Sequence, residues 1–152
     1  MIHDSGNRRE FPTGAVRDIS EGKGRCDLMP IAVVANLLDS LIGGDYVMRE
    51  IAAFAKTNET TCLYRALSTF AILAYDGSAE TMILEASKHF EEGAKKYGPN
   101  NWQKGLPINC YIDSGIRHYL KYRRGDEDEP HNRAFVWNVM CCIWEVDHHV
   151  KD

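Results

Sequence analysis

The stretch Pro130-His-Asn-Arg-Ala-Phe-Val-Trp-Asn-Val-Met-Cys-Cys-Ile-Trp-Glu-Val146 decides the fold, because it is apolar almost all the way round a helical turn. Pro130 suits the first turn of a helix, where a backbone N–H has no partner, so we predict a helix over about 130–148. A helix that is apolar on every side is buried at the centre of a domain or at a subunit interface. Its apolar surplus favours a homodimer or homotetramer.

Three polar residues of this helix, His131, Asn138 and Glu145, are spaced seven apart. At 3.6 residues per turn such positions drift by only ~20° per step, so they form one stripe. Polar groups on a buried helix need partners. For His131 and Asn138 both internal hydrogen bonding and a functional site remain open, whereas Glu145, near the far end, is expected in solvent.

The rest of the chain indicates further helices that are separated by glycine breaks. Asp27 is the expected N-cap of the first helix, and no credible pair of strands is expected. Residues 1–26 suggest an extended, irregular arm. The fold class that we predict is an all-α helical bundle in one domain, 1–152. The expected helices cover about 27–42, 45–56, 60–75, 79–97, 107–124 and 130–148.

In the helix over 79–97, helical spacing places Ile83, Ala86 and Phe90 on an apolar face. His89 and Glu92 fall on the opposite side. Such a charged side faces solvent by default, and facing a cleft is the alternative. The sequence therefore predicts that Ile83 is buried and His89 exposed.

Composition excludes several classes of protein. The chain of 152 residues has a formal net charge of −4, so no broad basic surface for nucleic acid is expected. No apolar run approaches the ~20 residues of a membrane span, and the polar N-terminus does not resemble a signal peptide. The five cysteines are odd in number and scattered, which favours free thiols in a reducing cytoplasm over disulfides or zinc. We therefore expect a cytoplasmic location.

Two populations of charge alternate between residues 93 and 138. The acids are suited to hard divalent cations, and the bases are suited to phosphate oxygens. Together they are what metal-assisted hydrolysis of a nucleoside triphosphate needs. The acids are Asp113, Asp126, Glu127, Asp128 and Glu129, and the bases are Lys95, Lys96, Lys104, Arg117, Lys121, Arg123 and Arg124.

Structural explanations stand beside these functional ones. Acids before a helix complement its dipole, although the four consecutive acids over 126–129 exceed that need. Asp113 and Arg117 are four residues apart and form either a simple salt bridge or a pair that holds metal and phosphate. His118 points away from Arg117 and is interpreted as structural.

Aromatic and amide side chains in the predicted loop over 98–106 indicate nucleobase binding. Tyr97 and Trp102 offer ring faces for stacking, Asn101 is a candidate for a base edge, and packing under the loop is the alternative. Lys23 and Arg25 of the arm bring cations near a phosphate, yet no Gly-x-x-x-x-Gly-Lys-Ser/Thr loop is present.

These motifs together resemble the bacteriophage-type dATP/dGTP diphosphohydrolases, a MazZ-like branch of the all-α MazG/HisE-like pyrophosphohydrolases. The resemblance covers 11–30 and 90–145, about half the chain, and 45–80 looks like a helical insertion. The motifs are Phe11-x-Thr-Gly-Ala-Val-Arg-Asp18, Glu21-Gly-Lys-Gly-Arg25-x-Asp-Leu-x-Pro30, Gly93-Ala-x-Lys-Tyr97, Asn101-Trp-x-Lys-Gly105, Arg117-His118, Gly125-Asp-Glu-Asp and His131…Trp137-Asn138.

The resemblance implies Mg²⁺- or Mn²⁺-dependent hydrolysis between the α- and β-phosphates of dGTP or dATP. It also implies a role in phage nucleotide pools, supplying dGMP for 2-aminoadenine DNA. The wider family pattern of Glu-x-x-Glu followed by Glu-x-x-Asp does not stand cleanly in this sequence.

We therefore assign the residues of the site from their charge and their position in the sequence. The expected catalytic residues are Glu127, Asp128, Arg117 and Lys96. The expected metal ligands are Glu92, Asp113, Glu127, Asp128 and His131. The expected substrate-binding residues are Lys23, Arg25, Tyr97, Asn101, Trp102, Lys104 and Asn138.

Two alternatives remain. An HD-type triphosphohydrolase would use His118 and His131 and release tripolyphosphate. A non-enzymatic phage interaction protein would carry the same acids as a solvated surface.

Overall fold

The computed structural model describes residues 3–150, and most of them are helical. The prediction of an all-α bundle is confirmed. Short irregular helices occur at Cys26–Leu28, Asn101–Lys104 and Val146–Val150, and two short strands are present in the arm. The main helices are α1 (Ile31–Ile42), α2 (Tyr46–Thr57), α3 (Thr60–Tyr75), α4 (Ala79–Tyr97), α5 (Ile108–Arg124) and α6 (His131–Glu145).

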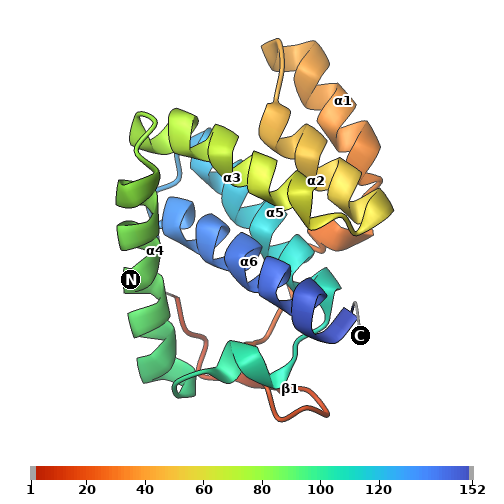
Figure 1. The fold of residues 1–152 in the computed structure, drawn as a ribbon. Coiled ribbons are helices and arrows are strands. Elements are labelled where there is room, and N and C mark those ends of the chain that lie inside the picture. The colour runs from red at the N-terminus through yellow and green to blue at the C-terminus, as the bar shows by residue number, and fades with distance from the viewer. Residues whose placement is uncertain (1–2, 151–152) are drawn as a thin grey trace.

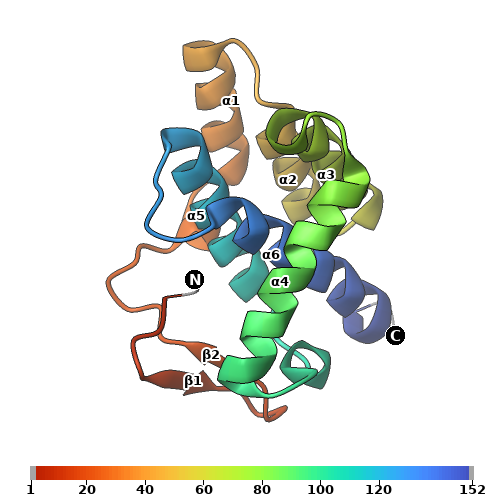
Figure 2. The same ribbon diagram turned by 90° about the vertical axis from the view of Figure 1, so that its left-hand side faces the viewer.

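Helix α6 lies at the centre of the molecule and packs against α5, α4 and α3 (Figure 1). Helices α1 and α2 pack on each other at the end away from the arm, and α2 also packs against α3. In the view of Figure 2 the N-terminal arm passes beside α4 and α5. Helices α4, α5 and α6 and the arm therefore lie around one region of the molecule, and α1 and α2 lie apart from that region.

Helix ends follow local sequence signals. The side chain of Asp45 accepts a hydrogen bond from Met48 N at 3.0 Å and caps α2, and Ser78 caps α4 through Thr81 N at 3.1 Å. Such caps satisfy N–H groups that have no partner within the helix. Gly125 ends α5 at φ 91°, a left-handed conformation that glycine adopts without strain.

An aromatic cluster forms the centre of the core. The ring of Phe70 on α3 lies 4.7 Å from that of Phe135 on α6, and both rings are fully buried. Tyr119 on α5 packs 5.2 Å from Phe135 and donates its hydroxyl to both carboxylate oxygens of Asp45 at 2.8 Å. The cap of α2 is thereby tied to α5 at the core.

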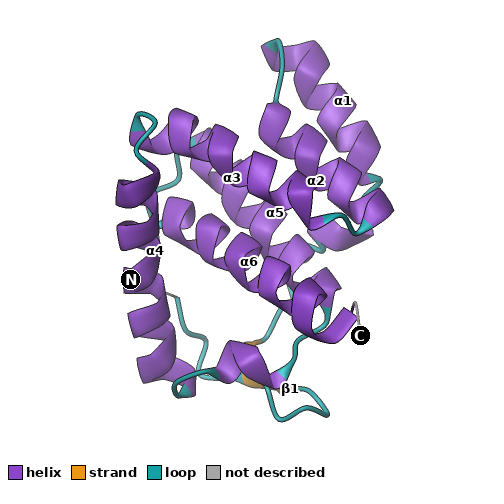
Figure 3. Ribbon diagram, viewed as in Figure 1, coloured by secondary structure: helices purple, strands orange, loops and turns teal. Residues whose placement is uncertain are grey.

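The expectation of no strand pair is wrong. Strands β1 (Arg8–Glu10) and β2 (Val16–Asp18) form a small antiparallel hairpin, which is the only orange element of Figure 3. Phe11 N donates to Ala15 O at 3.0 Å, and Gly14 supplies the positive φ of the turn. Strands of three residues carry too little alternation to be recognised from a sequence pattern.

Two expectations at helix ends are also wrong. Asp27 does not cap α1, because it lies in the turn Cys26–Leu28 and its carboxylate pairs with Arg25 at 2.7 Å. Glu145 is only 5% exposed rather than solvated, and it accepts a hydrogen bond from His149 at 2.9 Å.

The buried face of α4 is rotated from the predicted one. Ile83 is 53% exposed, whereas His89 is 7% exposed and faces α6 through Trp137. The rotation follows from packing, since Met82, Ala86 and His89 supply the contact side of the helix.

The position of α6 decides between burial at the centre of a domain and burial at a subunit interface. The apolar surplus of this helix is buried by α3, α4 and α5 of the same chain, so it gives no support to an oligomer, which stays a prediction. Among residues 3–150, no helix combines the length and apolar character needed to cross a membrane.

Candidate active site

A cavity of about 330 Å³ lies between the arm, α4, α5 and α6. Its volume is within the range of small-molecule sites. Six cationic side chains line it, against two carboxylates. The cations are Arg9, Arg17, Lys23, Lys96, Arg117 and Lys121, and the acids are Asp18 and Glu129. This balance suits a ligand with several negative charges.

Helix α5 supplies one wall through helical spacing. Ser114, Arg117, His118 and Lys121 are three or four residues apart, so they share a face, and all four line the cavity. At a rise of ~1.5 Å per residue the row extends for ~10 Å. The cavity therefore has two ends, one at Ser114 and one at Lys121.

The Ser114 end is built around Arg17 of β2. Its Nη2 donates to Ser114 Oγ at 2.8 Å and to Asn138 Oδ1 at 3.3 Å. The guanidinium carbon lies 5.5 Å from the centre of the Tyr111 ring and 5.6 Å from that of Trp137. Arg17 is therefore held between two helices and two rings.

His89 of α4 lies at the same end, with its ring centre 5.4 Å from that of Trp137. Burial, reinforced by Arg133 and Arg17, lowers the pKa of His89 to about 4. The imidazole is thus neutral at pH 7. This end of the cavity therefore places aromatic and neutral polar groups around the guanidinium of Arg17.

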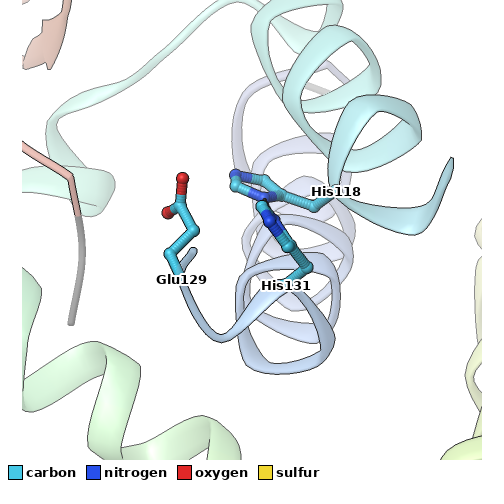
Figure 4. Close-up of side chains that lie close together, drawn as sticks. All are labelled: His118, Glu129 and His131. Carbon is cyan, nitrogen blue, oxygen red and sulfur yellow. Dashed lines mark hydrogen bonds between the residues drawn. The ribbon is translucent and has the colours of Figure 1, made fainter. Parts of the chain in front are cut away.

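The other end adjoins a cluster of histidines and acids. His118, Glu129 and His131 each offer a ligand atom within 4.8 Å of the others. Figure 4 shows the Glu129 carboxylate beside the two imidazole rings, whose Nδ1 atoms are 2.9 Å apart. Burial and the neighbouring His131 lower the pKa of His118 well below its usual value, so His118 is in the neutral form that binds metal ions.

The second nitrogen of His131 is held by a carboxylate. His131 Nε2 lies 2.6 Å from Asp128 Oδ1, and hydrogen bonding to His131 lowers the pKa of Asp128. A carboxylate on the far nitrogen fixes which imidazole nitrogen is free to bind a metal ion. Asp126 and His3 extend the same cluster. The donor set of two imidazoles and carboxylates fits a divalent cation.

Six of the sequence-predicted substrate and catalytic residues line this cavity together. They are Lys23, Lys96, Tyr97, Asn101, Arg117 and Asn138. Asp128 and His131, which the sequence also predicted, lie together in the adjoining cluster.

Other predicted residues are placed elsewhere. Asp113 is 3% exposed and engaged by Arg117 at 2.6 Å and by Cys26 N at 2.6 Å, so the salt-bridge alternative describes its position. Glu127 is exposed and lies outside the groups of metal-binding geometry found among residues 3–150, as does the half-buried Glu92.

The predicted base-binding loop is used for packing. Trp102 meets Phe90 and Trp144 edge to face, with ring centres 5.8 Å and 5.1 Å away. Asn101 is 6% exposed and bonds both N and O of Val16, which fixes the hairpin to the loop. Arg25 pairs with Asp27, and Lys104 lines a separate cavity beside Glu145.

Sequence reasoning missed several residues of the cavity, notably Arg17, His89, Ser114 and Trp137. It also treated His118 as structural. Arg17 lies within the motif Phe11–Asp18, which is one of the motifs that carry the family resemblance. Its place in that motif was therefore a usable signal. His89 stood in no such motif, and helical spacing favoured solvent for its face, whereas the alternative of a cleft describes where the structure places it.

An all-α fold with a cationic cavity beside a cluster of metal-binding geometry defines a candidate phosphohydrolase site. Residues 70–152, which span the end of α3 and all of α4, α5 and α6, match the family model described as dATP/dGTP diphosphohydrolase, N-terminal. The match covers more than half of the 152 residues, and the chain belongs to this family of nucleoside triphosphate pyrophosphohydrolases. Searches of curated proteins and of solved structures found no match.

Proposed function

We propose that this protein hydrolyses dGTP or dATP to the monophosphate and pyrophosphate in the cavity between the arm, α4, α5 and α6. One observation carries the proposal: a cavity with six cations and two acids adjoins a cluster of metal-binding geometry. The family match to a dATP/dGTP diphosphohydrolase supplies the reaction.

Three of the cations that line the cavity bind the triphosphate in this proposal. Arg117 and Lys121 come from α5 and Lys96 from α4, and all three line the cavity. Arg117 is fixed by Asp113 at 2.6 Å and by Gly24 O at 2.8 Å. A cation held in place before the substrate arrives stabilises developing charge without the cost of reorganisation.

The cluster formed by His118, Glu129 and His131 holds the divalent cation in this proposal, with Asp128 orienting His131. A cation bound there would polarise a phosphate and lower the pKa of an attacking water. Mn²⁺ and Mg²⁺ are the candidates, and the two imidazole donors favour Mn²⁺. Glu92, Asp113 and Glu127 stay predictions from the sequence as further ligands.

Several broader statements rest on the sequence alone. We propose a role in phage nucleotide-pool remodelling that supplies dGMP for 2-aminoadenine DNA, and assembly as a homodimer or homotetramer. We also propose a single domain in which 45–80 is a helical insertion.

Incubation with each of the four deoxynucleoside triphosphates and Mn²⁺ or Mg²⁺, followed by chromatography of the products, tests the proposed function. We expect dGMP or dAMP with pyrophosphate, and no turnover in excess EDTA. Deoxyguanosine with tripolyphosphate would support the HD-type alternative, to which the proximity of His118 and His131 lends some weight. Unchanged nucleotide would support the interaction protein.

A further inference from the structure

The start of the arm covers a cation to which the proposed function gives a role. His3 O accepts a hydrogen bond from Lys96 Nζ at 2.7 Å, and Asp4 Oδ1 lies 4.0 Å from the same nitrogen. The side chain of Lys96 is only 9% exposed, whereas those of His3 and Asp4 are 60% and 40% exposed. His3 and Asp4, here called the arm tip, therefore form an outer layer over Lys96.

The imidazole of His3 reaches a second wall of the cavity. Its Nε2 donates to the carbonyl oxygen of Asp128 at 3.0 Å, and its Nδ1 lies 3.6 Å from Glu129 Oε2. The side chain of Glu129, the acid of the proposed cation site, is 11% exposed. The arm tip thus bridges α4 and the loop between α5 and α6, through contacts that span 93 and 125 residues of sequence.

Local hydrogen bonds shape the arm tip independently of these walls. The carboxylate of Asp4 accepts from Arg8 Nη1 at 2.7 Å, from Arg8 Nη2 at 3.0 Å and from Gly6 N at 2.9 Å. Gly6 supplies the positive φ of this turn, at 84°. The turn is therefore held by its own residues, and the contacts of the arm tip with α4 and with the α5–α6 loop can break without unfolding it.

An incoming triphosphate needs the same lysine. In the proposed function the ammonium group of Lys96 donates to phosphate oxygens, yet His3 O already takes one of its donors. The carboxylate of Asp4 also places a negative charge 4.0 Å from that ammonium group, and like charges at such distances repel. A polyphosphate therefore reaches Lys96 fully only when the arm tip moves away.

We propose that the arm tip is an autoinhibitory cover that competes with the polyphosphate of a nucleotide for Lys96. The closed state spans from Lys96 to Glu129, and in the open state both side chains face the cavity. A ligand that binds only the open state has an apparent dissociation constant equal to its intrinsic one divided by the open fraction. This inference rests on the proposed function and adds the regulation of that site.

Inorganic tripolyphosphate in the presence of EDTA probes the anion site without turnover and without a metal ion. Calorimetric titration compares the unaltered protein with His3→Ala and Asp4→Asn. Surface contacts of this kind each shift an equilibrium by a few-fold, so each variant should bind tripolyphosphate about two- to fivefold more tightly. His3→Ala is the decisive variant, because the imidazole contacts Asp128 and Glu129 rather than Lys96. Tighter binding by this variant reports release of the arm tip.

Two control variants separate this effect from other causes. Glu50→Gln changes the net charge as Asp4→Asn does, at an acid that pairs with Arg65 away from the cavity. Asn7→Ala alters the arm at a residue that does not line the cavity. Both controls should leave the affinity for tripolyphosphate unchanged, and melting temperatures verify folding.

Unchanged affinity of His3→Ala for tripolyphosphate would overturn the proposal. Weaker binding by this variant would also overturn it, since His3 would then belong to the anion site. No measurable binding by any of these proteins would overturn it as well. Failure of the proposed function is a different result, because it appears as an absence of hydrolysis of every deoxynucleoside triphosphate by an unaltered protein that binds tripolyphosphate.

Discussion

The α5–α6 pair separates two regions of opposite chemistry. On one side Ile116 and Tyr119 of α5 meet Phe135 of α6 in a buried aromatic core with α3. On the other side His118 of α5 and Asn138 of α6 face a cavity rich in cations. One helix pair thus holds the fold together with one face and carries the candidate chemistry on the other.

The difference between the two faces shows which of them holds the helices in place. Buried charges and unpartnered donors are costly, so the cavity side does not stabilise the fold by itself. The packed core fixes the helices on which Ser114, Arg117 and His118 stand, and the arm adds Arg17 from outside. Substitutions in the core should therefore affect stability, and substitutions of the charged groups at the cavity should affect turnover. The pH dependence of stability reports on the buried, neutral His89, so four tests of the comparison follow.

The largest effect is expected in the core. Phe135→Ala removes a fully buried ring that meets Phe70 and Tyr119, and large-to-small changes of this kind cost about 3–5 kcal/mol. Urea unfolding should show this loss. Ile72→Ala, at a position that is 71% exposed, should change the free energy of unfolding by less than about 0.5 kcal/mol.

A smaller effect, confined to turnover, is expected in the cluster. Glu129→Gln keeps the shape of the side chain but removes the charge that would hold the cation beside His118 and His131, so kcat should fall by ~10² or more with little change in stability. Glu127→Gln is the matched comparison, since the sequence favours Glu127 and the structure favours Glu129. A large loss in Glu127→Gln alone would move the site to the exposed acid.

The pH dependence of stability should report His89. Its folded pKa of about 4 lies below the ordinary value of 6.5 because the ring is buried. Between these values the unfolded chain binds more protons, so stability falls as pH falls, by on the order of 2 kcal/mol for this group at pH 4.5. His89→Asn should flatten the unfolding free energy between pH 6.5 and 4.5. An unchanged slope would show that His89 is not the buried neutral group described.

The smallest effect should distinguish two lysines that the sequence treated alike. Lys96 lines the cavity and Lys104 does not. Lys96→Met should raise KM for dGTP several-fold, an effect of about 1 kcal/mol, whereas Lys104→Met should leave KM unchanged. Equal effects of the two substitutions would show that the triphosphate does not lie where the cavity places it.

Helical periodicity predicted the all-α fold and most helix positions, because glycine breaks and caps are local signals. The hairpin of β1 and β2 escaped prediction, since it depends on Asn101, a residue 85 positions away from Val16. The burial of His89 also depends on packing between helices distant in sequence. Local patterns do not specify such contacts.

Part of the candidate site was predictable for the same reason. Four charged or polar residues stood out because they lie in the motifs that carry the family resemblance: Lys96, Arg117, Asp128 and His131. Arg17 also stood in one of these motifs, but its place in the cavity was not predicted, because that position is fixed by partners on α5 and α6 rather than by its neighbours in sequence. Trp102, which the sequence predicts as a stacking surface, meets Phe90 of α4 and Trp144 of α6 edge to face, and local patterns do not specify these contacts.

Amide hydrogen exchange with and without a non-hydrolysable α,β-methylene analogue of dGTP and Mn²⁺ tests the central claim most directly. The analogue should slow exchange in four segments around the cavity, 16–23, 89–97, 114–121 and 129–138, and leave α1 and α2 unchanged. Protection over α1 and α2 without protection around the cavity would contradict the assignment of the site to the cationic face of the α5–α6 pair.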